Sequence, residues 1–250
     1  MMLVWMVSMM KSKMKWGEKM LEVKGIKKKF RRKEVLNNVS FYGKKGEITA
    51  LLGINGVGKS TLLKIIMGLI KEDDGEVLFD GEKRTYKTYE KIAFVPDVIN
   101  TYGGMKIKDA FEYMSVMYER WDMNKAYEML KDFKLNEEDK INNLSKGNIA
   151  RVKIILGFAR NPDYLLLDEP FSGIDIFTRE KFIASLVSYM NEDIGIILTT
   201  HEIKEIENVV DKVVFLSNGK VKSEFYVEDI REKGLSLVDK IREVHKGGKK

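Results

Sequence analysis

Residues 53–61 constrain this chain most, because they match the phosphate-binding loop pattern G-x-x-x-x-G-K-[ST]. Glycines allow the backbone to curl, so that successive N–H groups converge on phosphate oxygens. Lys59 can reach the outer phosphates, and the Ser60 hydroxyl is a ligand for Mg²⁺. The pattern therefore predicts a nucleoside triphosphate site. Its residues are Gly53, Ile54, Asn55, Gly56, Val57, Gly58, Lys59, Ser60 and Thr61.

The flanks of this loop have the composition that such a site needs. Residues 47–52 (EITALL) form an apolar run typical of a buried strand, and residues 59–69 have a helical apolar period. A phosphate would then lie at a helix N-terminus. A chance glycine-rich turn is the alternative, and the strand and helix on either side argue against it. The apolar face of the helix is expected to contain Leu62, Leu63, Ile66 and Leu69.

A second apolar run, residues 164–167, ends in Asp168 and Glu169. The run predicts a buried parallel strand that delivers two carboxylates to the phosphate edge of a sheet. Asp168 is expected to hold Mg²⁺, and Glu169 to activate the attacking water as a general base. Alone the pattern is weak, since an apolar strand often runs into a solvated acidic turn.

Three further segments strengthen this interpretation. Residues 144–148 (LSKGN) open a predicted helix that continues to about Arg160. Residues 172–175 (SGID) follow the two carboxylates, and a second apolar strand, 194–200, ends at His201. The core face of the helix is predicted to contain Ile149, Val152, Ile155 and Leu156.

In this order the motifs resemble those of the ATP-binding subunit of an ATP-binding cassette (ABC) transporter, over roughly residues 21–244. The resemblance implies ATP and Mg²⁺ as ligands. It implies that Ser145 and Gly147 contact the γ-phosphate of ATP held by a second ATPase subunit, and that Asp175 communicates across this dimer. It also implies that His201 bonds the γ-phosphate and positions the water. A lone histidine is more often structural, but the position after a buried strand favours the functional role.

Other positions follow or depart from the family pattern. Phe30 stands where the family has an aromatic ring that stacks on adenine, although a core strand residue is an alternative. Asp97 replaces the usual glutamine and can still ligate the metal. Lys146 and Asn148 depart from the usual Gly-Gly-Gln, so a cation is expected beside the partner's phosphate.

The composition limits the remaining possibilities. A chain of 250 residues, 44% hydrophobic with 3 prolines, is expected to form one domain. It has no cysteine, which excludes disulfides, thiolate metal sites and thiol catalysis. Its net charge of +6 comes from lysines at the two ends, so the body is near neutral and no nucleic-acid partner is expected.

The domain boundaries follow from the same reading. Residues 1–19 are expected to be a non-native or disordered extension, because residues 16–20 could be encoded by a ribosome-binding site before Met20. Residues 20–245 are expected to form the ABC ATPase domain, with a helical subdomain at about 98–160. Residues 246–250 are a basic tail.

No segment is expected to span a membrane, since the apolar run 1–10 is about half of the ~20 residues required. Transport would then need a separate transmembrane permease subunit, which holds the ATPase at the cytoplasmic face of the membrane. The segment 97–121 predicts a docking groove for a helix of this permease, because Met105, Tyr113 and Met117 lie off the apolar stripe. A stripe that serves only as core is the open alternative. The stripe contains Ile107, Phe111, Met114, Tyr118 and Trp121.

The sequence therefore predicts an α/β fold: a P-loop core with a mainly parallel sheet, an antiparallel β subdomain and an inserted helical subdomain. ATP is expected to close a homo- or heterodimer, and hydrolysis to reopen it. The compact helical region and a helix near residues 236–239 resemble those of export-type bacterial systems for drugs, peptides or lipids. A soluble ABC ATPase not tied to transport is the alternative. A kinase or GTPase would lack LSKGN and SGID.

Overall fold

A mainly parallel sheet carries the phosphate-binding loop. The structure is a computed structural model, and it describes residues 19–97, 102 and 104–246. Within these residues the sheet has the order β10-β9-β3-β8-β7-β6, and β10 alone runs antiparallel to its neighbour. The central strands are continuous apolar runs because helices and the second sheet cover both faces. The strands are β3 (Ile48–Leu52), β6 (Ile92–Val95), β7 (Tyr164–Asp168), β8 (Gly195–Thr200), β9 (Lys212–Ser217) and β10 (Lys220–Tyr226).

An antiparallel sheet lies beside this core, with the order β2-β1-β4-β5 among the described residues. Helix α2 (Lys59–Ile66) contributes apolar side chains to a core cluster that both sheets share. Leu62 and Leu63 of α2 are fully buried in this cluster, together with Leu21 of β1 and Leu51 of β3. The strands are β1 (Met20–Phe30), β2 (Lys33–Lys44), β4 (Asp74–Phe79) and β5 (Glu82–Lys83).

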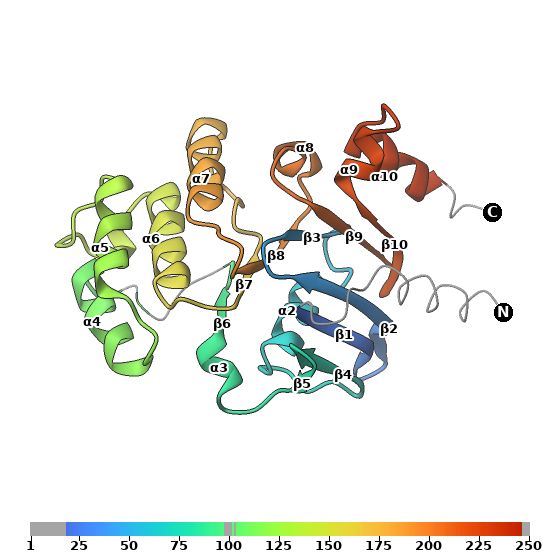
Figure 1. Ribbon diagram of the computed structural model, residues 1–250, viewed down its shortest axis with the longest axis horizontal. Coiled ribbons are helices and arrows are strands. Elements are labelled where there is room, and N and C mark those ends of the chain that lie inside the picture. The colour runs from blue at the N-terminus through green and yellow to red at the C-terminus, as the bar shows by residue number, and fades with distance from the viewer. Residues whose placement is uncertain (1–18, 98–101, 103, 247–250) are drawn as a thin grey trace.

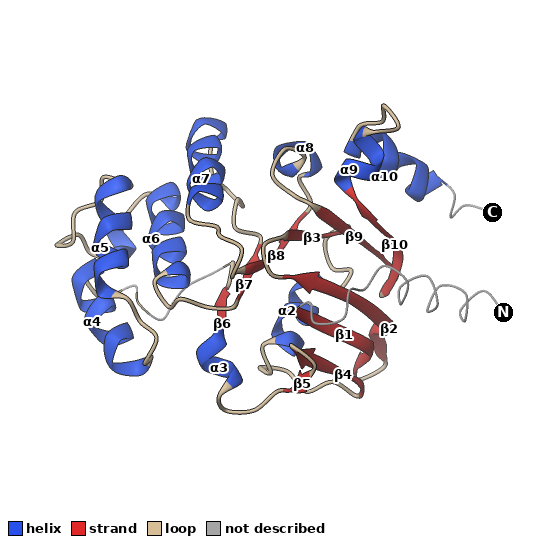
Figure 2. Ribbon diagram, in the orientation of Figure 1, coloured by secondary structure: helices blue, strands red, loops and turns tan. Residues whose placement is uncertain are grey.

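Helices α4, α5 and α6 form a group at the end of the molecule opposite α9 and α10 (Figure 1). The group joins the parallel sheet where α6 packs against β6 and β7. The helices are α3 (Thr88–Lys91), α4 (Ile107–Met117), α5 (Met123–Asp132), the 3₁₀ turn η1 (Ile141–Asn143), α6 (Lys146–Phe158), α7 (Ile176–Ser188), α8 (Ile203–Ile206), α9 (Val227–Arg231) and α10 (Leu237–Lys246). Figure 2 shows that this end of the molecule is helical, whereas the strands gather at the centre and the opposite end.

The predicted α/β class, parallel core, antiparallel subdomain and inserted helices are confirmed by this arrangement. The predicted helix over residues 59–69 is too long, because α2 ends at Ile66. Gly68 then adopts a left-handed conformation with φ 80°, and the Leu69 N–H turns back to the Lys64 carbonyl. Leu69 is consequently 62% exposed and not part of the core face.

Smaller differences concern the helical region. Val152, Ile155 and Leu156 are buried in α6 as predicted, but Ile149 is only half-buried. The apolar stripe continues past the end of α4, since Tyr118 packs on the core from the following turn. The expectations for residues 1–18 and 247–250 lie outside the described residues, and so do residues 98–101 and 103 of the predicted groove. No helix in the described part of the chain has the length and apolar character needed to cross a bilayer.

Candidate functional site

The loop between β3 and α2 has the backbone geometry of a phosphate cradle. Gly58 adopts φ 111°, and a Cβ there would lie 2.8 Å from Cδ2 of Leu36. A Cβ at Gly53 would lie 2.6 Å from the carbonyl oxygen of Leu216. Both positions therefore require glycine, one for its conformation and the other for the close approach of a neighbouring chain. The sequence pattern predicted glycine at both positions but not the residues that pack against them.

Lys59, the first residue of α2, is folded back across the loop. Its ammonium donates to the Gly53 carbonyl at 2.8 Å and lies 3.3 Å from Oε1 of Glu169. The side chain is only 5% exposed, so the charge is directed inward and not into solvent. This places the cation where outer phosphate oxygens of a nucleotide on the loop would lie.

Asp168 and Ser60 meet at the carboxyl end of the parallel sheet. The Ser60 hydroxyl donates to Oδ1 of Asp168 at 2.9 Å, and the Thr199 hydroxyl donates to the same oxygen at 2.8 Å. Asp168 is 4% exposed, so these hydroxyls replace the water that a carboxylate normally binds.

The donor set at Ser60 and Asp168 suits Mg²⁺, a hard cation that takes oxygen ligands and is often held by one or two carboxylates plus substrate phosphates. Groups of three or more acidic, histidine or cysteine side chains that could bind a metal are absent from the described residues. A metal at this position would therefore depend on phosphate oxygens for part of its coordination.

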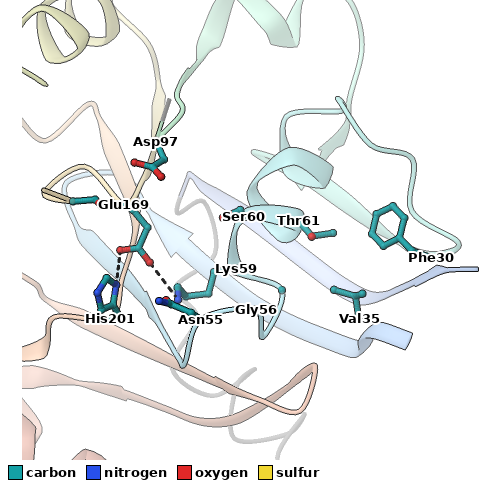
Figure 3. Close-up of a pocket in the computed structure, with 12 residues that line it drawn as sticks. Phe30, Val35, Asn55, Gly56, Lys59, Ser60, Thr61, Asp97, Glu169 and His201 are labelled. Carbon is teal, nitrogen blue, oxygen red and sulfur yellow. Dashed lines mark hydrogen bonds and ion pairs between the residues drawn. The ribbon is translucent and has the colours of Figure 1, made fainter. Parts of the chain in front are cut away.

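Glu169 is held in a conformation that few residues other than glycine adopt. Its φ is 45°, and its N–H donates to the Thr199 hydroxyl at 2.9 Å. Its Oε2 lies 3.0 Å from Nδ1 of His201, while Oε1 faces Lys59 (Figure 3). A left-handed backbone costs on the order of 1 kcal/mol for such a residue, and strain of this kind concentrates at functional sites. The carboxylate is thus fixed between an ammonium and an imidazole.

A cavity of about 450 Å³ opens over these side chains. Figure 3 shows Glu169 and His201 on one side of the loop, and Phe30 with Val35 at the other. Phe30 is 46% exposed, which leaves its ring accessible to a planar ligand. The cavity is lined by Phe30, Val35, Asn55, Gly56, Gly58, Lys59, Ser60, Thr61, Asp97, Glu169, Ser172 and His201.

The cavity brings together most of the residues that the sequence had singled out. Gly53, Ile54 and Val57 belong to the loop without lining the cavity, and Ile54 is 68% exposed. Asp168 does not line the cavity but is hydrogen-bonded to Ser60, which does. Ser145 and Gly147 do not line it either: Ser145 is the N-cap of α6, where its Oγ accepts from the Asn148 N–H at 3.3 Å. Asp175, just before α7, is exposed and outside the cavity.

Two features of the site were missed in the sequence. Thr199 bonds both the Asp168 carboxylate and the Glu169 backbone, so one hydroxyl orients both acidic residues. A polar residue within the buried run of β8 was the available signal. Val35 lines the cavity from β2, and nothing in its sequence context distinguishes it from other strand residues.

Comparison with known proteins defines the class to which this site belongs. The sequence matches the family described as "ABC transporter" over residues 36–172. It is 31% identical over 221 residues to the ABC transporter ATP-binding protein YtrB of Bacillus subtilis (strain 168), covering 87% of this chain and 76% of YtrB. It is 28% identical over 204 residues to the lantibiotic transport ATP-binding protein SrtF of Streptococcus pyogenes, covering 81% of this chain and 89% of SrtF.

The fold leads to the same class. A solved structure described as the ATP-binding subunit of an ABC transporter superposes with a TM-score of 0.80 at 29% identity, covering 90% of this chain and 99% of that chain. This chain belongs to the ABC transporter family and is an ATP-binding subunit, an ATPase whose hydrolysis of ATP is coupled to transport. The resemblance noted in the sequence is confirmed at this level.

Proposed function

We propose that the cavity binds Mg-ATP with its phosphates on the loop and its adenine on Phe30. Lys59 would hold the outer phosphates, and Ser60 and Asp168 would hold the metal, with Asp97 as a further oxygen ligand. Mg²⁺ would neutralise charge on the phosphate oxygens. The proposal is supported by the cavity lining, which joins a loop cation and an exposed ring within one space.

The catalytic base in this proposal is Glu169, and one observation carries the assignment. Its two carboxylate oxygens face different partners, Lys59 at 3.3 Å and His201 at 3.0 Å. A γ-phosphate bound to Lys59 would replace Glu169 as the partner of the ammonium. The Glu169 carboxylate would then be free to accept a proton from water. His201 would bond the γ-phosphate and orient Glu169 toward that water.

A second subunit is part of the proposed mechanism. Ser145 and Gly147 lie at the start of α6, outside the cavity of their own chain. Free N–H groups and a hydroxyl at a helix start favour an anion. We assign this anion as the γ-phosphate of ATP on a second ATPase subunit, identical or different, with Asp175 communicating across the dimer.

ABC ATP-binding subunits work with transmembrane permeases, and we propose that α4 takes part in docking to one. Tyr113, Val116 and Met117 of α4 are 41%, 85% and 53% exposed, a cluster of apolar side chains that suits a docking helix. The ATPase would then lie at the inner face of the cell membrane through its permease, where hydrolysis changes the access of the transport path.

The proposed direction of transport is export, of a drug, peptide or lipid. The name of the relative SrtF assigns that protein to lantibiotic transport, and SrtF matches most of this chain. The alternative of a soluble ABC ATPase not tied to transport is not favoured, because the matching family and relatives are named as transport proteins. Purification of the tagged chain from detergent-solubilised membranes tests the proposed permease: an integral membrane protein that co-purifies supports it, and the absence of such a protein contradicts it.

The hydrolytic assignment is tested with Glu169→Gln. This change keeps the shape of the side chain but removes the proton acceptor, so turnover should fall roughly 10²- to 10⁴-fold while ATP still binds. Glu180→Gln, the same change on an exposed residue of α7, is the matched control and should retain turnover. Full turnover in Glu169→Gln would show that another group is the base.

A further inference from the structure

Lys153 of α6 joins two segments that both belong to the proposed mechanism. Its ammonium donates to the carbonyl oxygen of Pro96 at 2.9 Å and to that of Asp97. These carbonyls lie directly after β6, where the chain enters the cavity wall. Among the described residues no ion pair includes Lys153, so its contacts are to backbone carbonyls and not to a carboxylate.

A glycine one turn away explains how α6 comes close enough for this contact. A Cβ at Gly157 would lie 2.9 Å from Cγ2 of Val95 and 3.0 Å from Cδ1 of Leu165, so the helix packs almost directly on β6 and β7. Residues four apart share one face of a helix, which places Lys153 on this face and one turn nearer the carboxyl end of β6. The close packing at Gly157 therefore directs the lysine to the strand end.

Burying the ammonium of Lys153 costs free energy, so a lysine at this position suggests that its contact with the two carbonyls has a function. Burial lowers the pKa of Lys153, whereas the nearby charges of Asp97 and Asp168 raise it. A half-buried ammonium with only carbonyl partners loses much of its hydration, and an apolar residue of similar length would avoid this cost. The carboxylates that favour the charged form belong to the nucleotide site, so the lysine is electrostatically linked to that site.

We propose that Lys153 is a positioning residue that fixes the Asp97 segment to α6, so that Asp97 keeps its place in the cavity wall. This inference rests on the proposed role of Asp97 as a metal ligand. Ser145 starts the same helix eight residues earlier, about 12 Å along its axis at 1.5 Å per residue. One rigid helix thus carries the tether for this subunit's metal site and the serine proposed to meet the second subunit's ATP.

The test compares three variants of the full chain in steady-state ATP hydrolysis. Lys153→Met keeps the aliphatic stem but releases both carbonyls, and it should lower kcat about tenfold with KM for ATP changed less than about twofold. It should also raise the Mg²⁺ concentration for half-maximal turnover. Lys153→Arg, which can still donate to both carbonyls, should restore most of the lost turnover.

Lys125→Met is the matched control. Lys125 is also half-buried, its pKa is lowered by burial, and its ammonium donates to Oδ1 of Asn161 at 3.0 Å within the helical group. It lies outside the cavity, so this variant should keep the kcat and the Mg²⁺ dependence of the parent. If Lys153→Met lost no more turnover than Lys125→Met, the proposed role of Lys153 would be overturned.

A double variant separates this inference from the proposed function. If Lys153 acts through Asp97, Lys153→Met combined with Asp97→Asn should behave like Asp97→Asn alone. Independent, multiplicative losses would overturn the inference but leave the ATPase assignment intact. If the parent lacks hydrolysis, the proposed catalytic site and the role of Lys153 fail together. Should Lys153→Met not fold, Lys153→Gln, which is too short to reach both carbonyls, takes its place with the same expected losses and the same contradicting outcomes.

Discussion

The ammonium of Lys59 lies 3.3 Å from a carboxylate oxygen of Glu169, although the two residues belong to segments more than a hundred positions apart. Lys59 is 5% exposed and the Glu169 side chain is 15% exposed, so solvent screens this pair weakly. The lysine proposed to bind phosphate and the proposed general base therefore form an ion pair with each other. A phosphate that binds Lys59 has to compete with the carboxylate.

This competition predicts that Glu169→Gln binds ADP more tightly than the parent. Removing the carboxylate charge leaves Lys59 available to the β-phosphate, and a gain of about three- to tenfold in affinity is expected for one such pair. Isothermal titration with ADP in the absence of Mg²⁺ measures this without hydrolysis. Asp97→Asn is the control. It removes a carboxylate that lines the same cavity but forms no ion pair with Lys59 among the described residues. An equal gain in both variants would mean that total charge, and not the ion pair, limits affinity.

Asp97 predicts an unusual metal dependence. If its carboxylate supplies a ligand for Mg²⁺, Asp97→Asn should raise the Mg²⁺ concentration for half-maximal turnover several-fold. Binding of ATP without metal should change little. Asp229→Asn, at an exposed residue of α9, provides the control. Superimposable Mg²⁺ titrations of Asp97→Asn and the parent would place the Asp97 side chain outside the metal site.

The buried Lys212 on β9 predicts a pH dependence of stability. Its ammonium donates to the Tyr42 carbonyl at 2.7 Å and lies 2.5 Å from Oε1 of Glu224, with 1% of the side chain exposed. Burial lowers the pKa of Lys212 from its ordinary 10.5 to about 8, although Glu224 raises it. At a pH between the folded-state pKa of about 8 and the ordinary pKa of 10.5, Lys212 is protonated more often in the unfolded chain than in the folded chain. The free energy of unfolding therefore rises with pH over this range.

Urea unfolding at pH 7.5 and pH 9.5 measures this effect. The parent should gain about 1–2 kcal/mol over this interval, and Lys212→Met should lack most of the gain. Lys222→Met, on the half-buried to exposed strand β10, is the control and should show the same gain as the parent. A flat profile in the parent would indicate that Lys212 stays charged throughout.

Local patterns in the sequence were sufficient to predict the strands that carry the candidate site. The loop 53–61, the strand ending in Asp168 and Glu169, and the strand before His201 each depend on residues close in sequence, and the structure brings their ends together. Parallel strands place their carboxyl ends at one edge of a sheet, so the meeting of these segments follows from the strand assignments alone.

Contacts across long sequence separations were not predictable in this way. The bridging hydroxyl of Thr199 and the tether from Lys153 depend on which strand neighbours β7 and how closely α6 packs on β6. Leu69 illustrates the opposite error, since its helical period continued in the sequence while Gly68 ended the helix. Apolar periodicity predicts which residues would share one face of a helix, but a single residue in the left-handed conformation can end the helix before that face is complete.

The central claim is that ATP joins two subunits, with Lys59 of one and Ser145 of the other at each nucleotide. Size-exclusion chromatography with light scattering of Glu169→Gln, at saturating Mg-ATP, tests it most directly. ATP that is bound but not cleaved favours association by mass action, so a dimer should form that the nucleotide-free protein lacks. Adding Ser145→Arg should abolish this dimer without weakening ATP binding to the monomer. Ser115→Arg, the same change at an exposed residue of α4, should leave the dimer intact. For a dimer of two copies of this chain, a Glu169→Gln protein that stays monomeric with ATP bound, or a dimer that Ser145→Arg does not disrupt, would contradict the claim.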